Sequence, residues 1–350
     1  MATIYDVARL AGVSPGTVSN ALNHAGKVAP ETEKRILEAI EQVKYVPNRM
    51  ARSLKTNRSR SIFVIAEDVR AFPAPRILDG ISEYCHEAGY DLTLFNLRIS
   101  PEIRNFDYGL YLGTQRFRQD LAAALAQAKS LHTCAVIYAG IYPRDMGNVF
   151  PPLDIPVAFC YTYSHGLPSV NCNDYTGARL AAEQLLKTGH RKIGVILGKT
   201  DALPTRRRLS GFADALGERG VTLPPEYVAG GGGWSYEDGR EACRRLLCLP
   251  DRPTAIFSMS DVMAAGAVHA AQDAGLCVPD DLSVHGYDNY EGLSFFRPAL
   301  TTIEMPLGEI GRRGAQLAIS LSEGRAPEKT DVLVECRLLE RASVAPPGKG

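Results

Sequence analysis

The sequence predicts a small helical module followed by a large α/β body built on parallel sheets. In the first sixty residues, helix-capping residues and short apolar stripes recur at helical spacing. From Ser61 onward, short apolar runs alternate with helical stretches, which is typical of βαβ units. The first sixty residues hold 10 Lys and Arg against 5 Asp and Glu, whereas the rest of the chain holds 29 against 34. A basic module joined to an acidic body suggests that the module binds a polyanion.

The composition is that of a globular protein, with 45% hydrophobic and 22% charged residues. The start, MATIYDVARL, lacks the charged and apolar regions of a secretory signal, and no apolar run approaches the roughly 20 residues that span a bilayer. The eight cysteines form no CxxC pair, which favours reduced thiols over zinc or disulfides. We therefore expect a cytoplasmic protein with no membrane contact, metal or cofactor.

The first predicted helix begins after Thr3, which can cap it together with Asp6 three residues on. Its apolar face is supplied by Val7, Ala8, Leu10 and Ala11. Gly12 then permits a turn in which we expect a Cβ to be crowded.

The second predicted helix has Ser14 as N-cap and Pro15 in the first helical position. Two short helices around a turn of three or four residues have the helix-turn-helix geometry, in which the second helix enters the major groove of DNA. A third helix opens at Pro30 and is predicted to turn Ile36, Leu37, Ile40 and Val43 inward. The alternative is a helical cap or dimerisation module. The basic linker over residues 47–58, too short for a stable helix alone in water, favours DNA.

Motifs along the whole chain resemble the lactose/galactose repressor family (LacI/GalR). In the module they are Thr3-Ile4-Tyr5-Asp6-Val7-Ala8, Ala11-Gly12-Val13-Ser14, Thr17-Val18-Ser19, Leu22-Asn23 and Tyr45-Val46-Pro47-Asn48. In the body they include Asp174-x-x-Gly177, Arg208-x-x-Gly211-Phe212, Gly286-Tyr287-Asp288 and Pro298-Ala299-Leu300-Thr301-Thr302-Ile303.

The resemblance implies a dimeric, effector-controlled transcription factor in three parts. These are a headpiece over residues 1–47, a hinge helix and linker over 48–60, and a core over 61–345 that is similar to periplasmic sugar-binding proteins. In the core, the first lobe is expected at about 61–171 plus 303–325 and the second at about 172–302 plus 326–342.

The resemblance also implies roles in DNA binding. Base-reading positions fall on Pro15, Gly16 and Asn20, and phosphate contacts on Tyr5, Ser14, Thr17, Ser19, Asn23 and Asn48. In the hinge helix, Ala51 contacts DNA and Leu54 is the apolar wedge that enters the minor groove. Because Pro15 and Gly16 offer no side-chain hydrogen bonds, direct base readout depends on Asn20, which suits adenine.

The body is predicted to contain two successive α/β units with a ligand cleft between them. Strands are expected at 62–66, 92–95, 135–138, 157–159, 193–197, 255–257 and 282–284, and helices at 77–88 and 175–188; residues 98–119 are only loosely placed. Ligands in such sheets bind outside the carboxyl ends of the strands.

The resemblance implies an effector site in that cleft. Arg208 would donate a forked pair of hydrogen bonds, Asp288 would accept from sugar hydroxyls, and Trp234 would pack against the ligand. The alternative for Trp234 is a place in the lobe core or at its rim. Tyr161 and Ser260 would be polar cleft groups, and Phe72, Pro73 and Ile77 would form the first-lobe wall.

Other motifs do not support enzymatic chemistry. Gly194-x-x-x-Gly198-Lys199-Thr200 is one residue short of a phosphate loop and overlaps a predicted strand, and Gly230–Gly233 lacks a dinucleotide-binding context. No histidine, cysteine or serine lies in a metal or nucleophile motif. A sugar-processing enzyme with a fused headpiece and a secreted solute receptor are the rival hypotheses.

We therefore predict a repressor of carbohydrate-utilisation genes that binds a near-palindromic operator in double-stranded DNA and responds to a sugar-like effector. The segment after Glu340 is short, rich in Pro and Gly, and lacks heptads, which predicts a homodimer rather than a tetramer.

Overall fold

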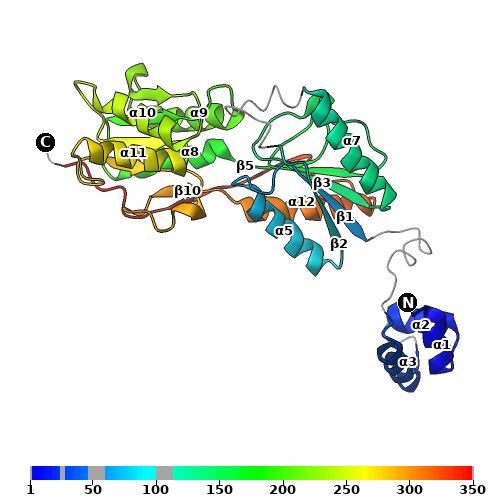
Figure 1. Ribbon diagram of the computed structural model, residues 1–350. Coiled ribbons are helices and arrows are strands. Elements are labelled where there is room, and N and C mark those ends of the chain that lie inside the picture. Colours follow the sequence, from blue (N-terminus) through cyan, green and yellow to red (C-terminus); the bar gives the residue numbers. More distant parts are fainter. Residues whose placement is uncertain (1, 24–27, 46–59, 100–112, 349–350) are drawn as a thin grey trace. The chain divides into compact units, whose positions relative to one another are not determined.

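The computed structural model describes residues 2–23, 28–45, 60–99 and 113–348. The chain divides into two compact units, Met1–Ser59 and Arg60–Gly350 (Figure 1). No helix in the described ranges is both long and apolar enough to cross a lipid bilayer.

The described residues of the first unit form three short helices, α1 (Ile4–Ala11), α2 (Pro15–Asn23) and α3 (Pro30–Val43). The predicted capping box is present at α1, where the backbone N–H of Thr3 donates to Asp6 Oδ2 at 2.9 Å. Apolar side chains of all three helices form one small core, which contains Val7, Ala8, Ala11, Val18, Ile36 and Ala39. The three-residue turn between α1 and α2 gives the predicted helix-turn-helix arrangement.

Some headpiece details differ from the prediction. Leu10 and Leu37, expected to face inward, are 47% and 56% exposed. One residue step rotates a helix by about 100°, so Leu10 and Leu37 turn outward while their neighbours Ala11 and Ile36, also predicted to face inward, are buried. Gly12 has a φ of +64°, and nothing lies within 4 Å of where its Cβ would be. The turn therefore requires glycine because its backbone is left-handed, and not because a Cβ would be crowded.

The first lobe of the second unit is a six-stranded parallel sheet in the order β11-β5-β4-β3-β1-β2. Its strands are β1 (Ser61–Ala66), β2 (Asp91–Asn96), β3 (Ala135–Ala139), β4 (Val157–Cys160), β5 (Ser169–Cys172) and β11 (Asp331–Val334). Helices α5 (Ala74–Glu87) and α12 (Leu307–Ser322) pack together on one face, and α7 (Gln115–Ser130) covers the other (Figure 1). Successive strand side chains point to opposite faces, so Ile62 and Val64 join one core while Phe63 and Ile65 join the other.

The second lobe is a four-stranded parallel sheet in the order β7-β6-β8-β9. Its strands are β6 (Ile193–Leu197), β7 (Val228–Gly230), β8 (Ala255–Ser258) and β9 (Ser283–His285). Two helix pairs accompany them, α8 (Asp174–Lys187) with α9 (Leu203–Gly217) and α10 (Tyr236–Leu247) with α11 (Asp261–Asp273). Short 3₁₀ turns lie at Pro225–Tyr227 and Glu291–Leu293 in this lobe, and at Gly147–Val149 in the first lobe.

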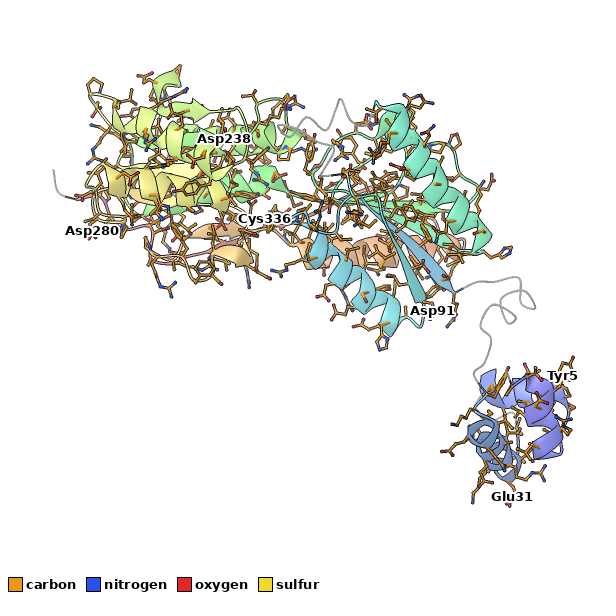
Figure 2. The ribbon with its side chains drawn as sticks, in the orientation of Figure 1. Tyr5, Glu31, Asp91, Asp238, Asp280 and Cys336 are labelled. Atoms are coloured by element: carbon orange, nitrogen blue, oxygen red, sulfur yellow. The ribbon has the colours of Figure 1, made fainter. Side chains whose placement is uncertain are left out.

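Within the described ranges, the chain passes between the lobes three times. The crossings lie between β5 and α8, between β10 (Thr302–Glu304) and α12, and between β11 and β12 (Arg337–Leu339), where Cys336 is labelled in Figure 2. β10 and β12 pair with each other as an antiparallel two-stranded sheet.

One lobe assignment needs correction. Residues 326–342 were expected in the second lobe, but β11 pairs with β5 and therefore completes the first-lobe sheet. Val334 lies opposite Cys172 in this pairing, so the last exchange between lobes happens after Val334 rather than before residue 326.

Candidate functional site

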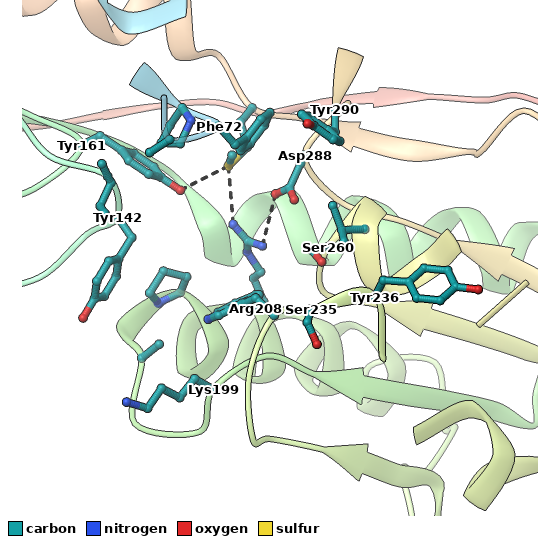
Figure 3. Close-up of a pocket in the computed structure, with 18 residues that line it drawn as sticks. Phe72, Tyr142, Tyr161, Lys199, Arg208, Ser235, Tyr236, Ser260, Asp288 and Tyr290 are labelled. Atoms are coloured by element: carbon teal, nitrogen blue, oxygen red, sulfur yellow. Dashed lines mark hydrogen bonds and ion pairs between the residues drawn. The ribbon is translucent and has the colours of Figure 1, made fainter. Parts of the chain in front are cut away.

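A cavity of about 690 Å³ lies between the two lobes (Figure 3). Its lining residues include Ile141 and Tyr161, which follow first-lobe strands, and Lys199 and Ser260, which follow second-lobe strands. The cavity therefore lies at the carboxyl ends of parallel strands, where open α/β sheets bind their ligands.

The structure brings together seven of the eight predicted effector residues. Those that line the cavity are Phe72, Pro73, Tyr161, Arg208, Trp234, Ser260 and Asp288. The prediction for Ile77 is wrong, because this residue lies one helical turn beyond the cavity wall, on the face of α5 that packs against the sheet. It is fully buried in the core there.

Arg208 on α9 is the most connected polar group in the cavity. It is 2% exposed, and its Nε donates to Asp174 Oδ1 at 2.8 Å, while Nη1 lies 3.6 Å from Asp288 Oδ1. Its guanidinium also lies 3.7 Å above the ring centre of Tyr287. Burial alone would lower the pKa of Arg208, but the nearby Asp174, Tyr287 and Asp288 raise it well above its usual value. Arg208 therefore stays cationic inside the protein.

Two strong donors in the cavity converge on a weak acceptor. Tyr161 Oη and Arg208 Nη2 each donate to the thioether sulfur of Met305 at 3.5 Å (Figure 3). Tyr161 follows first-lobe strand β4, Arg208 belongs to second-lobe α9, and Met305 lies on the crossing after β10. Because a hydroxyl or carboxylate oxygen accepts more strongly than a thioether, a ligand oxygen at this point would gain two good donors.

Asp288 faces the same space with its carboxyl group. Burial raises the pKa of Asp288 well above its usual value, and the attraction of Arg208 offsets this only in part. The carboxyl group can thus accept a hydrogen bond from a ligand hydroxyl, or donate one when it is protonated. Its backbone has a φ of 120°, a conformation that side-chain-bearing residues rarely adopt, and the N–H donates to Ile303 at 2.8 Å.

Trp234 lies against the backbone of Gly198. A Cβ at residue 198 would approach the indole ring to 2.2 Å, so only glycine leaves room for the ring in this position. The guanidinium of Arg208 is 5.7 Å from the ring centre. Trp234 therefore belongs to the cavity wall, and the ring offers an apolar surface there.

Sequence reasoning missed several lining residues. They include Tyr142, Lys199, Ser235, Tyr236, Tyr290 and Met305. In the sequence, Lys199 stands out only as part of the incomplete phosphate-loop motif. Its position, two residues after the end of β6, was the usable signal, because residues that follow a parallel strand face the ligand-binding edge.

The predicted DNA contacts of the headpiece gather around the start of α2. Ser14, Gly16 and Asn20 are exposed, and Pro15, Thr17 and Ser19 are half-buried. Tyr5 on α1 is 71% exposed and projects from the headpiece surface (Figure 2). Ser14 Oγ accepts from the backbone N–H of Thr17 at 3.1 Å, as expected for the residue that caps α2.

The other DNA-contact predictions cannot be placed on this surface. Asn48, Ala51 and Leu54, together with the predicted hinge helix, lie outside the described residues, as does the side chain of Asn23.

Both units of the chain match known protein families. Residues 3–48 match the family described as bacterial regulatory proteins, lacI family, and residues 182–344 match the periplasmic binding protein-like domain. The HTH-type transcriptional repressor PurR of Mannheimia succiniciproducens is 33% identical over 353 residues, which cover 98% of this chain and 99% of that protein. The PurR of Haemophilus influenzae strain PittEE is 34% identical, over 91% of this chain and 90% of that protein.

Solved structures share the same fold. A lac repressor dimer bound to operator and the anti-inducer ONPF is similar with a TM-score of 0.77 and 27% identity, over 98% of this chain and 99% of that one. The complex of the transcriptional regulator CelR with cellobiose is similar with a TM-score of 0.65 and 26% identity, over 98% of this chain and 100% of that one. The α/β core thus has the two-lobed architecture of periplasmic binding proteins.

Proposed function

Since this chain belongs to the lacI family of bacterial regulatory proteins, we propose that it is a transcriptional repressor whose operator affinity is set by a small effector in the interlobe cavity. The observation that carries this proposal is the coexistence of a helix-turn-helix headpiece and a ligand-sized cavity in one chain. An enzymatic role has less support, because the relatives bear the names of repressors. The protein would act in the bacterial cytoplasm, where it meets DNA.

The exposed start of α2 is the proposed reading surface for the major groove. Asn20 would contact bases beside Pro15 and Gly16, while Tyr5, Thr17 and Ser19 would bind phosphates. Residues 1–45 carry five basic and five acidic side chains, whereas residues 46–60 carry five basic and none acidic. The linker therefore supplies the excess positive charge, alongside the proposed contacts of Asn48, Ala51 and Leu54.

A sugar or sugar derivative is the effector class that we propose. Trp234 offers an apolar ring to the C–H face of a sugar, while Arg208, Asp288, Tyr161 and Ser260 offer donors and acceptors to its hydroxyls. The similar regulator in complex with cellobiose supports this choice. A purine is the second candidate, since the relatives bear the name PurR.

The proposed functional form is a homodimer, which matches the two half-sites of a near-palindromic operator. The edge strand β2 exposes Leu92 and Leu94, which are 37% and 45% accessible and, two residues apart, lie on the same face. A second copy of the chain would cover this apolar edge.

Operator binding tests the DNA part of the proposal. The protein should bind a fragment from upstream of its own gene, and the affinity should fall steeply as salt rises, because bound phosphates release counterions. Leu54→Ala should weaken binding to this fragment much more than binding to unrelated DNA. Absence of binding to any upstream fragment, or affinity that does not depend on salt, would refute it.

A thermal-shift screen tests the effector part. A ligand that binds the native state raises the melting temperature, so sugars and purine bases are compared on the same protein. Stabilisation by a purine base but by no sugar would replace the first candidate with the second.

A further inference from the structure

The thioether of Met305 lies where the two lobes meet in the cavity. Met305 follows β10 and precedes α12, so it belongs to one of the crossings between lobes, and it lines the cavity. Its sulfur accepts hydrogen bonds from Tyr161 Oη of the first lobe and Arg208 Nη2 of the second, each at 3.5 Å (Figure 3). A thioether is a weak acceptor, so these two strong donors are only weakly satisfied.

Both donors keep their protons inside the protein. Burial raises the pKa of Tyr161 well above its usual value, so the hydroxyl stays protonated. Burial alone would lower the pKa of Arg208, but Asp174 and the other groups around it raise this pKa well above its usual value. The phenol and the guanidinium can therefore donate to any oxygen that comes to lie at the sulfur.

The cavity gives small solutes a route to this sulfur. Met305 is 3% exposed and lines the cavity of about 690 Å³, which has room for a molecule much larger than a peroxide. Met146, Met259 and Met263 are each 0% exposed and do not line this cavity. Of these four methionines in the described chain, Met305 is thus the one that a solute in the cavity can reach.

Oxygen transfer from a hydroperoxide would give the two donors a better acceptor. A sulfur lone pair attacks the terminal peroxide oxygen, and the S–O bond forms as the O–O bond breaks. The sulfur loses two electrons, the peroxide is reduced to an alcohol or to water, and the proton of the terminal hydroxyl goes to the departing oxygen. The product is methionine sulfoxide, a polar group whose oxygen can accept from both donors.

We propose that Met305 is a site of oxidation by a hydroperoxide, and that Tyr161 Oη and Arg208 Nη2 hold the resulting sulfoxide oxygen. The sulfoxide then joins a first-lobe donor to a second-lobe donor, at the point where an effector oxygen would gain the same two hydrogen bonds. Oxidation therefore alters operator affinity through the lobes. This last consequence rests on the proposed function of the cavity, whereas the oxidation site does not.

Peptide mapping by mass spectrometry after treatment with hydrogen peroxide tests the site. In the folded full-length protein, Met305 should oxidise at least about tenfold faster than Met259 and Met263. In urea the three should oxidise at similar rates, because burial no longer protects any of them. Met259 is the matched control, since its backbone carbonyl accepts from Arg208 Nη1 at 2.5 Å while its side chain is buried. Equal rates in the folded protein would overturn the proposal.

The stereochemistry of the product is a second readout. Oxidation makes the sulfur chiral, and each of two methionine sulfoxide reductases reduces one epimer. Since peroxide reaches the sulfur from the cavity, the Met305 peptide from folded, oxidised protein should be reduced almost fully by one of these enzymes. The same peptide from protein oxidised in urea should be reduced in part by each. A mixture of epimers from the folded protein would show that the sulfoxide is not held.

Tyr161→Phe tests the role of the first-lobe donor. It removes the hydroxyl and keeps the ring, and it should slow the oxidation of Met305 about three- to tenfold, because one hydrogen bond to the forming sulfoxide oxygen is lost. Tyr290→Phe is the control, as it makes the same change elsewhere on the cavity wall. Equal rates in the wild type and Tyr161→Phe would exclude Tyr161 as a donor to the sulfoxide.

Operator binding separates this proposal from the proposed function. Met305→Leu keeps a similar volume and removes the oxidisable sulfur. Peroxide treatment should change the operator affinity of the wild type about fivefold more than that of Met305→Leu, in which any change comes from other oxidised residues. An equal change in both proteins would exclude control through Met305. If operator binding is absent, the repressor is excluded, and peptide mapping still decides the oxidation site.

Discussion

At the scale of single residues, the cavity depends on charges that are buried in the fold itself. Arg208 and Asp174 are 2% and 0% exposed, and the distance between their paired atoms is 2.8 Å. The residue expected to bind the effector is therefore also a structural residue, because loss of one partner leaves the other charge buried without compensation.

Arg208→Ala should lower the free energy of unfolding by about 3–5 kcal/mol, as expected for breaking a buried ion pair. Urea unfolding measures this loss. Arg206→Ala is the control, because Arg206 lies on the same helix and is exposed. A loss of the same size in both variants would contradict the structural role of Arg208.

Asp261 should make stability depend on pH. Burial raises its pKa from 3.8 to about 6, although Thr302 and the backbone N–H of Tyr290 donate to its carboxylate. The folded protein then binds the proton more tightly than the unfolded chain. This contribution is fully present below about pH 4 and is lost as pH rises through about 6.

Asp261→Asn removes this titration and keeps a similar shape. The stability of the wild type relative to Asp261→Asn should therefore fall by up to about 3 kcal/mol between pH 4 and pH 7, in denaturant unfolding at several pH values. A constant difference over this range would show that Asp261 does not titrate there.

At the scale of elements, the loops that follow the strands build the site. The loop after β6 places Gly198 under the Trp234 ring and Lys199 in the cavity, so one short connection shapes both the apolar and the charged wall. Such connections tolerate little change in shape where another side chain packs on their backbone.

Gly198→Ala should displace Trp234, because the added Cβ would lie 2.2 Å from the ring. The emission of this single tryptophan should shift, and any effector should bind at least about tenfold more weakly, since its apolar wall has moved. Gly217→Ala is the control on α9, where nothing lies within 4 Å of the new Cβ. Unchanged fluorescence in Gly198→Ala would refute the packing.

The elements also show what the sequence could predict. Apolar runs such as Ile62–Ala66 and Ile193–Leu197 predicted β1 and β6, because buried parallel strands are continuously apolar. β7 and β11 were missed because they are edge strands that are only partly buried, so neither is a continuous apolar run. Helix α7 begins inside the stretch 98–119, for which the sequence predicted no definite structure. Polar residues between Phe117 and Leu121 obscure the helical spacing of the apolar side chains.

The effector residues that the sequence predicted likewise differ from those that it missed. Arg208 and Asp288 were found because the family motifs contain them, and Trp234 because the resemblance implies a ring at its position. Met305 was missed because its position depends on a crossing between lobes that sequence spacing does not reveal. Ile77 was misplaced because a helix face towards a cavity and one towards a sheet are equally apolar.

At the scale of the whole molecule, the first-lobe sheet has two open edges, β2 and β11. Each exposes a leucine, Leu94 at 45% and Leu333 at 46%. Only β2 presents two exposed leucines on one face, which makes it the stronger apolar edge.

Leu94→Glu should therefore weaken dimerisation, because it places a charge in the proposed interface, whereas Leu333→Glu should leave it intact. Sedimentation velocity measures the oligomeric state. Operator affinity should fall together with dimerisation in Leu94→Glu, since a single headpiece reads one half-site. Dimers of normal strength in Leu94→Glu would exclude β2 from the interface.

The three crossings between lobes have a consequence for biosynthesis. The first-lobe sheet pairs β5, which ends at Cys172, with β11, which ends at Val334, so this lobe is completed only after the second-lobe strands β6 to β9 have been translated. At roughly 5–20 residues per second, the ribosome needs roughly 8–30 seconds between these two strands. During this interval the edge of β5 has not yet paired with β11. The sheet face that α12 covers is exposed until that helix has been synthesised. The headpiece, whose helices end at Val43, can form as soon as it leaves the ribosome.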